Sequence, residues 1–280
     1  MSQGKLFVVA TPIGNLQDWS PRARAVIGQV DLVAAEDTRT SRHLLNAFNL
    51  NPTMVSLHDH NERDQVRGLL DRIEAGQSIA VISDAGTPLI SDPGYRLIAA
   101  AHETGVRVEV VPGASALTAA MSVSGLPSDR FQFVGFPPLK GRKAWLEALR
   151  EVEHTLVFFE APHRILKLLE EMADIFGADR QAVICRELTK QFEQTVSGSI
   201  ASLGLSVSSG EIPCKGEFVL VVGGDVKSED QEEPLLDQLI GALKDQVAPS
   251  VLADRLSGIL GGRKNHIYRK ILAAKQQSQS

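Results

Sequence analysis

The chain has 280 residues, of which 43% are hydrophobic and 22% are charged, and its formal net charge is −5. This length favours two domains, and the composition is typical of a soluble globular protein. The negative charge excludes a protein that binds nucleic acid over its whole surface, although it is compatible with a local basic patch. No apolar run approaches the roughly 18 residues that a membrane helix needs, so no membrane partner is expected.

Cysteine and histidine usage gives two further expectations. Cys185 and Cys214 do not form a CxxC pair, which favours reduced thiols in a cytoplasmic protein. Residues 6–10 form an apolar run that is too short for the core of a signal peptide. His58 and His60 flank an aspartate, but no further His or Cys ligand lies nearby in the sequence, so no metal is expected.

The strongest local signal lies in residues 79–94. Residues 79–82 are typical of a strand buried on both faces, and they end at Ser-Asp-Ala-Gly-Thr-Pro, a run of turn-forming and small residues. A second break at residues 91–94 leads into an apolar stretch, and residues 106–111 form another buried-strand run. This order of strand, helix and strand predicts a parallel sheet with a right-handed crossover.

Two loops of small residues follow these strands. In such sheets ligands bind beyond the carboxyl ends of the strands, and small residues let a ligand approach the backbone. Either loop alone could be an ordinary turn, but two together, one with an acid, favour a cofactor site. The loop residues of interest are Asp84, Ala85, Gly86, Thr87 and Pro88 after the first strand, and Ser115 and Ala116 after the second.

Other strands of the first half are expected at residues 6–10, 31–35 and 54–57. The loop after the first lacks GxGxxG, so it is not built to hold a diphosphate at a helix start. Asn61 can cap a helix that ends near Gly76. Eight polar residues, 36–43, follow the second strand; they are either a solvated helix start capped by Thr40 or Ser41, or a substrate-facing loop, which we favour because it follows a strand.

The second half predicts a mixed sheet with helices. A break at residues 125–128 suggests a domain boundary near residue 125. Strands are expected at residues 131–136, 155–159 and 181–185, with residues 192–196 and 216–222 as antiparallel partners. The basic loop at residues 140–143 is either solvated surface or a phosphate-contacting loop.

The last part of the chain reverses its charge. Residues 223–237 contain six acids and one lysine and predict an exposed linker. Three helical stretches follow, and residues 263–275 contain five cations and no acid. The pattern around Gly261 and Gly262 is compatible with a helix-turn-helix or with a plain helical tail, and its charge suggests an anionic partner.

Seven motifs occur together in a fixed order: Thr11-Pro-Ile-Gly-Asn-Leu16, Glu36-Asp-Thr-Arg39, Leu57-His-Asp-His-Asn-Glu62, Ser83-Asp-Ala-Gly-Thr-Pro-Leu-Ile-Ser-Asp-Pro-Gly94, Gly125-Leu-Pro-Ser-Asp-Arg130, Arg186-Glu-Leu-Thr-Lys190 and Lys215-Gly-Glu217. With them, residues 5–275 resemble the bacterial family of ribosomal RNA small subunit methyltransferase I. Members of that family are 16S rRNA (cytidine-2′-O)-methyltransferases and belong to the tetrapyrrole methylase superfamily.

The resemblance implies an α/β fold with two domains of tetrapyrrole-methylase type, residues 1–125 and 126–224, followed by an acidic linker and basic helical tail at residues 225–280. It also implies a homodimer that binds S-adenosyl-L-methionine in the interdomain cleft. Asp84 is the candidate acceptor for the ribose hydroxyls of the cofactor. Carried over position by position, the cofactor contacts are Pro12, Asp84, Ala85, Gly86, Thr87, Pro88, Ser115, Ala116, Phe159 and Leu188.

The implied substrate is a decoding-region cytidine in 16S rRNA or in the small ribosomal subunit. A ribose 2′-hydroxyl is a weak acid, so its methylation benefits from a base or from a cation that stabilises the alkoxide. Each candidate could equally be half of a structural ion pair. The candidate bases are Asp37, Glu160, Glu187 and Glu193, and the candidate cations are Arg39 and Lys190.

Two other functions are compatible with parts of the pattern. One is a tetrapyrrole ring C-methyltransferase, and the other is a non-catalytic RNA-binding or ribosome assembly factor. Superfamily members that act on tetrapyrroles have a glycine-rich, acid-containing first loop, whereas this chain has Pro12-Ile13-Gly14-Asn15. The first loop therefore argues against a porphyrin substrate.

Overall fold

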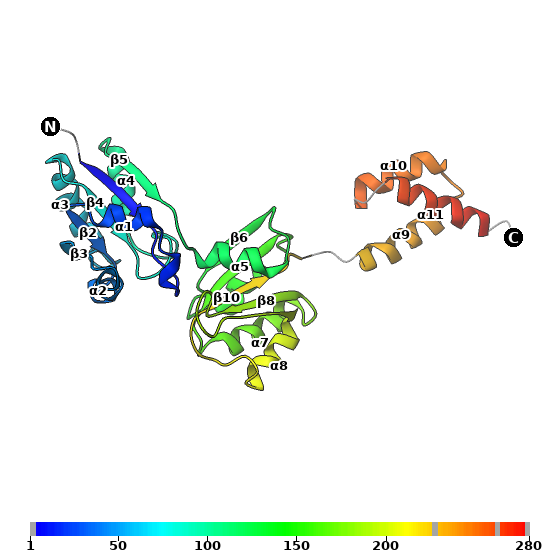
Figure 1. The fold of residues 1–280 in the computed structure, drawn as a ribbon. Coiled ribbons are helices and arrows are strands. Elements are labelled where there is room, and N and C mark those ends of the chain that lie inside the picture. The colour runs from blue at the N-terminus through cyan, green and yellow to red at the C-terminus, as the bar shows by residue number, and fades with distance from the viewer. Residues whose placement is uncertain (1–3, 226–228, 261–263, 278–280) are drawn as a thin grey trace. The chain divides into compact units, whose positions relative to one another are not determined.

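The computed structural model describes residues 4–225, 229–260 and 264–277. Contacts within the chain divide it into two compact units, residues 1–224 and residues 225–280. The first unit contains two five-stranded sheets and their helices, and the second consists of helices (Figure 1). This architecture confirms the predicted α/β class with a helical extension.

The first sheet is parallel and has the strand order β3-β2-β4-β1-β5. The parallel arrangement confirms the crossover predicted for residues 79–111. Every residue of β2 and β4 is buried, as their continuous apolar runs require. The strands are β1 (Lys5–Val9), β2 (Leu32–Ala35), β3 (Met54–Ser56), β4 (Ile79–Ile82) and β5 (Arg107–Val111).

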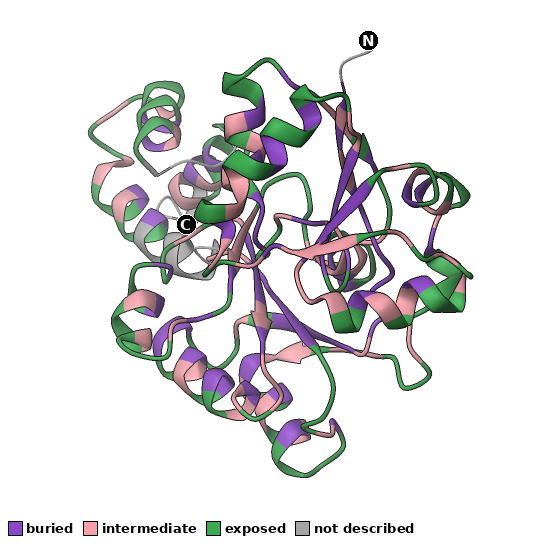
Figure 2. Cartoon of the chain, turned by 90° about the vertical axis from the view of Figure 1, so that its left-hand side faces the viewer, coloured by how far each residue is buried: buried purple, intermediate pink, exposed green. Residues whose placement is uncertain are grey.

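Helices cover both faces of this sheet, because alternate strand residues point to opposite sides. In β4, Ile79 and Val81 join one apolar cluster, which includes residues of α3 (Glu62–Glu74) and α4 (Tyr95–Glu103). Ala80 and Ile82 join another, with residues of α1 (Pro21–Ile27) and α2 (Thr38–Ala47). Figure 2 shows buried strands inside and helices with exposed outer faces.

The second sheet is mixed and has the order β6-β7-β10-β8-β9. The prediction that its last two strands pair with each other is wrong. β10 is buried at every position and lies between β7 and β8, whereas the half-exposed β9 is an edge strand. The strands are β6 (Phe131–Gly135), β7 (Thr155–Glu160), β8 (Gln181–Arg186), β9 (Gln194–Ser199) and β10 (Phe218–Val222).

One face of the second sheet packs on α6 (Arg142–Glu147), α7 (Ile165–Phe176) and α8 (Ile200–Ser208). The other face packs on α5 (Ala116–Ser124), whose Ala120 and Met121 contact the same apolar cluster as Val219. The boundary near residue 125 stays a prediction, although α5 precedes it and already lies on the second sheet.

Two helix starts differ from their predictions. The loop predicted over residues 36–43 is wrong from Thr38 onward, where α2 begins, and the proposed caps Thr40 and Ser41 lie inside the helix. Asp37 is the cap, because its Oδ1 accepts a hydrogen bond from the Arg39 backbone N at 2.8 Å. Asn61 does precede α3, but its Oδ1 accepts from the His58 backbone N at 2.8 Å.

The second unit consists of α9 (Glu229–Leu243), α10 (Pro249–Leu260) and α11 (Lys264–Gln277). These helices pack around the buried side chains of Ile240, Leu256 and Ile271. The linker prediction is wrong from residue 229 onward, where α9 begins. Residues 226–228 and the predicted turn at residues 261–263 lie outside the described part. Within that part, no helix has both the length and the apolar character needed to cross a membrane.

Candidate functional site

A cavity of about 420 Å³ opens at the carboxyl ends of the first sheet's strands. Its walls also include the end of β7 and the start of β10 from the second sheet. Three of the predicted cofactor contacts, Pro12, Pro88 and Leu188, are buried outside this lining. The other seven line the cavity: Asp84, Ala85, Gly86, Thr87, Ser115, Ala116 and Phe159.

The loop after β4 is held in place by its neighbours. The backbone N of Thr11 donates to the Gly86 carbonyl at 2.8 Å, and the Thr87 hydroxyl donates to the Ala114 carbonyl at 3.0 Å. Gly86 has φ +84°, and a Cβ there would lie 3.1 Å from Cγ2 of Ile13. Only glycine adopts this backbone without strain, so a ligand meets a fixed, bare backbone here.

Three carboxyl groups gather on the first-sheet wall of the cavity, namely Glu36, Asp84 and Asp92. Burial is the main reason that the pKa of each is raised, and neighbouring carboxylates raise it further. For Asp92 the pKa rises to about 7. The backbone N of Asp84 donates to Oε2 of Glu36 at 3.3 Å, which brings these two groups together.

No Lys or Arg side chain is among the described residues that line this cavity. The described residues also contain no group of three or more His, Cys, Asp or Glu side chains placed to hold a metal ion. A wall of carboxyl groups without a balancing cation favours a positively charged organic ligand.

The opposite wall of the cavity is apolar and comes mainly from the second sheet. Phe136 and Phe159 pack edge to face with ring centroids 5.6 Å apart, and Ile13 and Val219 lie in the same lining. The residue Phe136 is 55% exposed to solvent, which is unusual for an aromatic side chain. Such a wall suits the flat apolar part of a ligand.

Asp37 and Arg39, two predicted catalytic residues, form a pair outside the cavity lining. Oδ2 of Asp37 lies 2.9 Å from Nη2 of Arg39, whose side chain is 89% exposed. Hydrogen bonds from Arg39 lower the pKa of Asp37 to about 2, so this carboxylate is a weak base.

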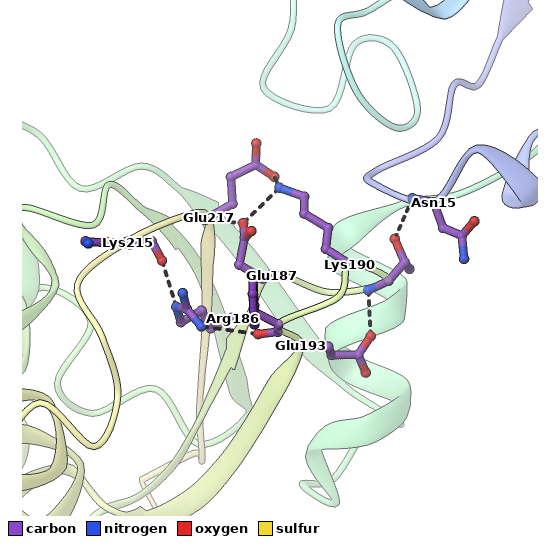
Figure 3. Close-up of polar contacts among 9 residues, drawn as sticks. Asn15, Arg186, Glu187, Lys190, Glu193, Lys215 and Glu217 are labelled. Carbon is purple, nitrogen blue, oxygen red and sulfur yellow. Dashed lines mark hydrogen bonds and ion pairs between the residues drawn. The ribbon is translucent and has the colours of Figure 1, made fainter. Parts of the chain in front are cut away.

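Lys190 and Glu193, the other two predicted catalytic residues, also lie outside the lining. Figure 3 shows their polar contacts. Nζ of Lys190 lies 2.8 Å from Oε1 of Glu187 and 3.1 Å from Oε2 of Glu217, which itself lines the cavity. Oε2 of Glu193 accepts a hydrogen bond from the Thr189 backbone N at 2.6 Å. Lys190 is therefore connected to the cavity rim through Glu217, whereas Glu193 stabilises the loop.

Glu160 lines the cavity, but its carboxylate is fully buried. Oε1 lies 3.1 Å from Nε of Arg164 and accepts a hydrogen bond from the Ala161 backbone N at 2.8 Å. Oε2 lies 3.8 Å from Nη1 of Arg142. Burial raises the pKa of Glu160. These contacts indicate that Glu160 holds two arginines in place.

The sequence reasoning did not select Glu36, Asp92, Phe136 or Glu217 as site residues, although all four line the cavity. Glu36 and Asp92 had a usable signal, because each belongs to a polar break that follows a buried strand of the first sheet. Glu217 had a signal only as part of the Lys215-Gly-Glu217 motif, and Phe136 had none, since its place depends on how the second sheet meets the first.

A sequence profile of the tetrapyrrole (corrin/porphyrin) methylases matches residues 5–204 of the chain. The chain is also similar to two proteins named ribosomal RNA small subunit methyltransferase I. The one from Pseudomonas aeruginosa is 46% identical, over 99% of this chain and 100% of that protein. The one from Escherichia coli O157:H7 is 42% identical, over 97% of this chain and 96% of that protein.

Among solved structures, the chain is similar to uroporphyrin-III C-methyltransferase from Thermus thermophilus in complex with S-adenosyl homocysteine. The TM-score is 0.55 and the identity is 19%, over 79% of this chain and 97% of that one. At this identity the likeness supports the shared fold alone.

Proposed function

Because this chain belongs to the ribosomal RNA small subunit methyltransferase I family of the tetrapyrrole methylases, we propose that it methylates the 2′-hydroxyl of a decoding-region cytidine in 16S rRNA. The methyl donor is S-adenosylmethionine. The observation that carries the proposal is the cavity, which combines a carboxyl-rich wall with an aromatic one.

The chemistry of the cavity fits this donor. S-adenosylmethionine has a flat adenine, ribose hydroxyls and a net positive charge on its methionine part. Phe159 and Ile13 offer the apolar surface for the adenine, and Asp84 offers an acceptor for the hydroxyls. The uncompensated charge of Glu36 and Asp84 favours the sulfonium. The donor contains no phosphate, so the absence of GxGxxG in the first loop is expected.

The bound donor supplies a methyl group on a sulfonium, which is already a good leaving group, so positioning provides much of the rate. The attacking hydroxyl must lose its proton. We propose Asp92 as the acceptor, because it lines the cavity and its pKa of about 7 is close to neutral pH.

The remaining candidates take other roles in this proposal. Lys190, at the cavity rim, stabilises the developing alkoxide or a nearby phosphate, and the exposed Arg39 contacts the RNA outside the cavity. Asp37 caps α2, and Glu193 accepts a hydrogen bond from the backbone of its loop, so neither is proposed as the base. We further propose a cytoplasmic homodimer, on the strength of the resemblance alone.

The test is a methylation assay with three substrates. Purified protein receives methyl-labelled S-adenosylmethionine and either small ribosomal subunits or naked 16S rRNA from cells that lack it, or uroporphyrinogen. We expect label on the ribose of one decoding-region cytidine, located by mass mapping. Label on uroporphyrinogen alone would show a tetrapyrrole methylase instead. A protein that binds no donor in calorimetry would point to the non-catalytic alternative.

A further inference from the structure

A second hollow, of about 620 Å³, lies between the loop before α6 and the start of α7. We call it the basic groove. Four of its nine lining residues are Arg142, Lys143, Arg164 and Lys167, and Glu171 is the one acid among them. This excess of cations is notable in a chain whose net charge is −5, and it marks a site for an anionic partner.

Two of these cations are fixed by carboxylates. Nε of Arg142 lies 2.5 Å from Oε2 of Glu171, with both side chains largely buried. Nε of Arg164 lies 3.1 Å from Oε1 of the buried Glu160. The pKa of Glu171 is lowered first by its hydrogen bond from Arg142, so this carboxylate stays charged. The arginines therefore give the groove a fixed floor.

The two lysines are available. Lys143 and Lys167 are exposed, and neither makes a hydrogen bond or an ion pair with any residue that the structure describes. Both residues line the same hollow as Glu171, and their charges lower the pKa of that carboxyl further. Two unpaired ammonium groups beside a fixed floor suit the oxygens of a phosphodiester.

The basic groove lies next to the cavity, because Glu160 of the cavity lining pairs with Arg164 of the groove lining. Glu160, Ala161 and Pro162 line the cavity, and the next two residues, His163 and Arg164, line the groove. In the loop before α6, Phe136 lines the cavity and Leu139, which is 84% exposed, lines the groove. A polymer bound at the cavity therefore has the lysines within reach of its neighbouring phosphates, and the exposed ring of Phe136 can stack on a base.

We infer that the basic groove binds the backbone phosphates of the RNA strand next to the methylated nucleotide, with Lys143 and Lys167 as the phosphate contacts. This inference rests on the proposed function, because it takes the cavity as the place of methyl transfer. The closeness of the groove to the cavity favours the substrate polymer over an acidic segment of another protein.

The test compares the pair Lys143→Ala and Lys167→Ala with a matched pair, Arg72→Ala and Arg150→Ala. The matched pair also removes two exposed cations, but at the far end of α3 and beyond the end of α6. Binding of 16S rRNA fragments to the full chain is measured at several salt concentrations, together with calorimetry of S-adenosylmethionine.

For the lysine pair we expect RNA binding about tenfold weaker at low salt and a salt slope reduced by about 2, one for each lost phosphate contact. The lysine pair should keep the wild-type affinity for S-adenosylmethionine. The matched arginine pair should keep the wild-type RNA binding. If the double lysine variant keeps the wild-type salt slope and RNA affinity and still methylates rRNA, the groove is not the phosphate-binding site, and the proposed function is unaffected. A wild type that neither binds nor methylates rRNA would overturn both.

Discussion

The cavity and the basic groove are both lined by the segment before α6 and by the segment that leads into α7, but the carboxyl groups in the two places have opposite pKa shifts. In the cavity, Asp92 is half-buried with no Lys or Arg among the described lining residues, and its pKa is raised to about 7. In the groove, Glu171 has Arg142 beside it, and its pKa is lowered. Burial is common to both places, so the presence of a partner decides which carboxyl group stays charged.

The difference suits the two hollows to ligands of opposite charge. In the cavity, Asp92 has a pKa of about 7 and can hold a proton near neutral pH, and a bound cation favours the release of that proton. The groove keeps its arginines neutralised and leaves two lysines for an anion. Methyl transfer to RNA needs a cationic donor and an anionic acceptor side by side. The composition, with a net charge of −5, does not reveal this separation.

Glu160 lies at the boundary of the two regions, and its substitution should have the largest effect. Glu160→Ala removes the acceptor for the Arg164 guanidinium and for the Ala161 backbone N, whereas Arg142 keeps its pair with Glu171. We expect the free energy of unfolding to fall by about 3 kcal/mol in urea denaturation at pH 7, because a largely buried arginine and a backbone N lose their partner. Glu170→Ala, on the exposed side of α7, is the matched control. Equal unfolding midpoints would mean that the arginines do not depend on Glu160.

Asp92→Asn tests the acidic wall as a source of chemistry. Loss of the proton acceptor should lower kcat about 100-fold while the affinity for S-adenosylmethionine changes little. In the wild type, kcat should rise as the pH increases through about 7, because Asp92 must be ionised to act, and this rise should vanish in the variant. A variant with the wild-type pH profile would remove Asp92 from the mechanism.

The same variant provides a check on folding. The pKa of Asp92 is raised in the folded chain, so its ionisation costs stability as the pH rises from about 4 through 7. An asparagine cannot ionise. Asp92→Asn should therefore be at least as stable as the wild type at pH 8, and a loss of kcat cannot be attributed to unfolding.

Much of the first sheet was predictable because its signals are local. Continuous apolar runs such as residues 79–82 predict fully buried strands, and small residues after them mark the ligand edge. These local signals and the family resemblance together selected ten cofactor positions, and seven of them, from Asp84 to Phe159 along the chain, line the cavity. They remain predictions as contacts until a donor complex is measured.

The second sheet was less predictable because strand order is a long-range property. β10 is as apolar as β4, yet its sequence does not say that it inserts between β7 and β8. Capping was also ambiguous in residues 36–43, since Asp37, Thr40 and Ser41 can all cap a helix. The ion pair between Lys190 and Glu217 could not be predicted either, because the two residues are distant in sequence and only the fold brings them together.

Asp84→Ala addresses the acidic wall as a binding surface. Loss of the acceptor and its charge should weaken S-adenosylmethionine about tenfold, or about 1.4 kcal/mol, in calorimetry at pH 8. Asp129→Ala removes an exposed acid away from both hollows and should have no effect. Unchanged affinity in Asp84→Ala would refute the assignment of the ribose hydroxyls to Asp84.

Lys190→Ala should have the smallest effect, because the charge of Lys190 is already shared between two carboxylates. Its side chain is 27% exposed, and Glu187 and Glu217 both pair with it, so solvent and counter-charge weaken its field at the cavity. We expect kcat to fall about threefold with unchanged affinity for the donor. The neighbouring Lys215→Ala, whose side chain is exposed, is the control. An unchanged kcat would leave Lys190 with a structural role only, and the two loops it joins in Figure 3 would then account for its position.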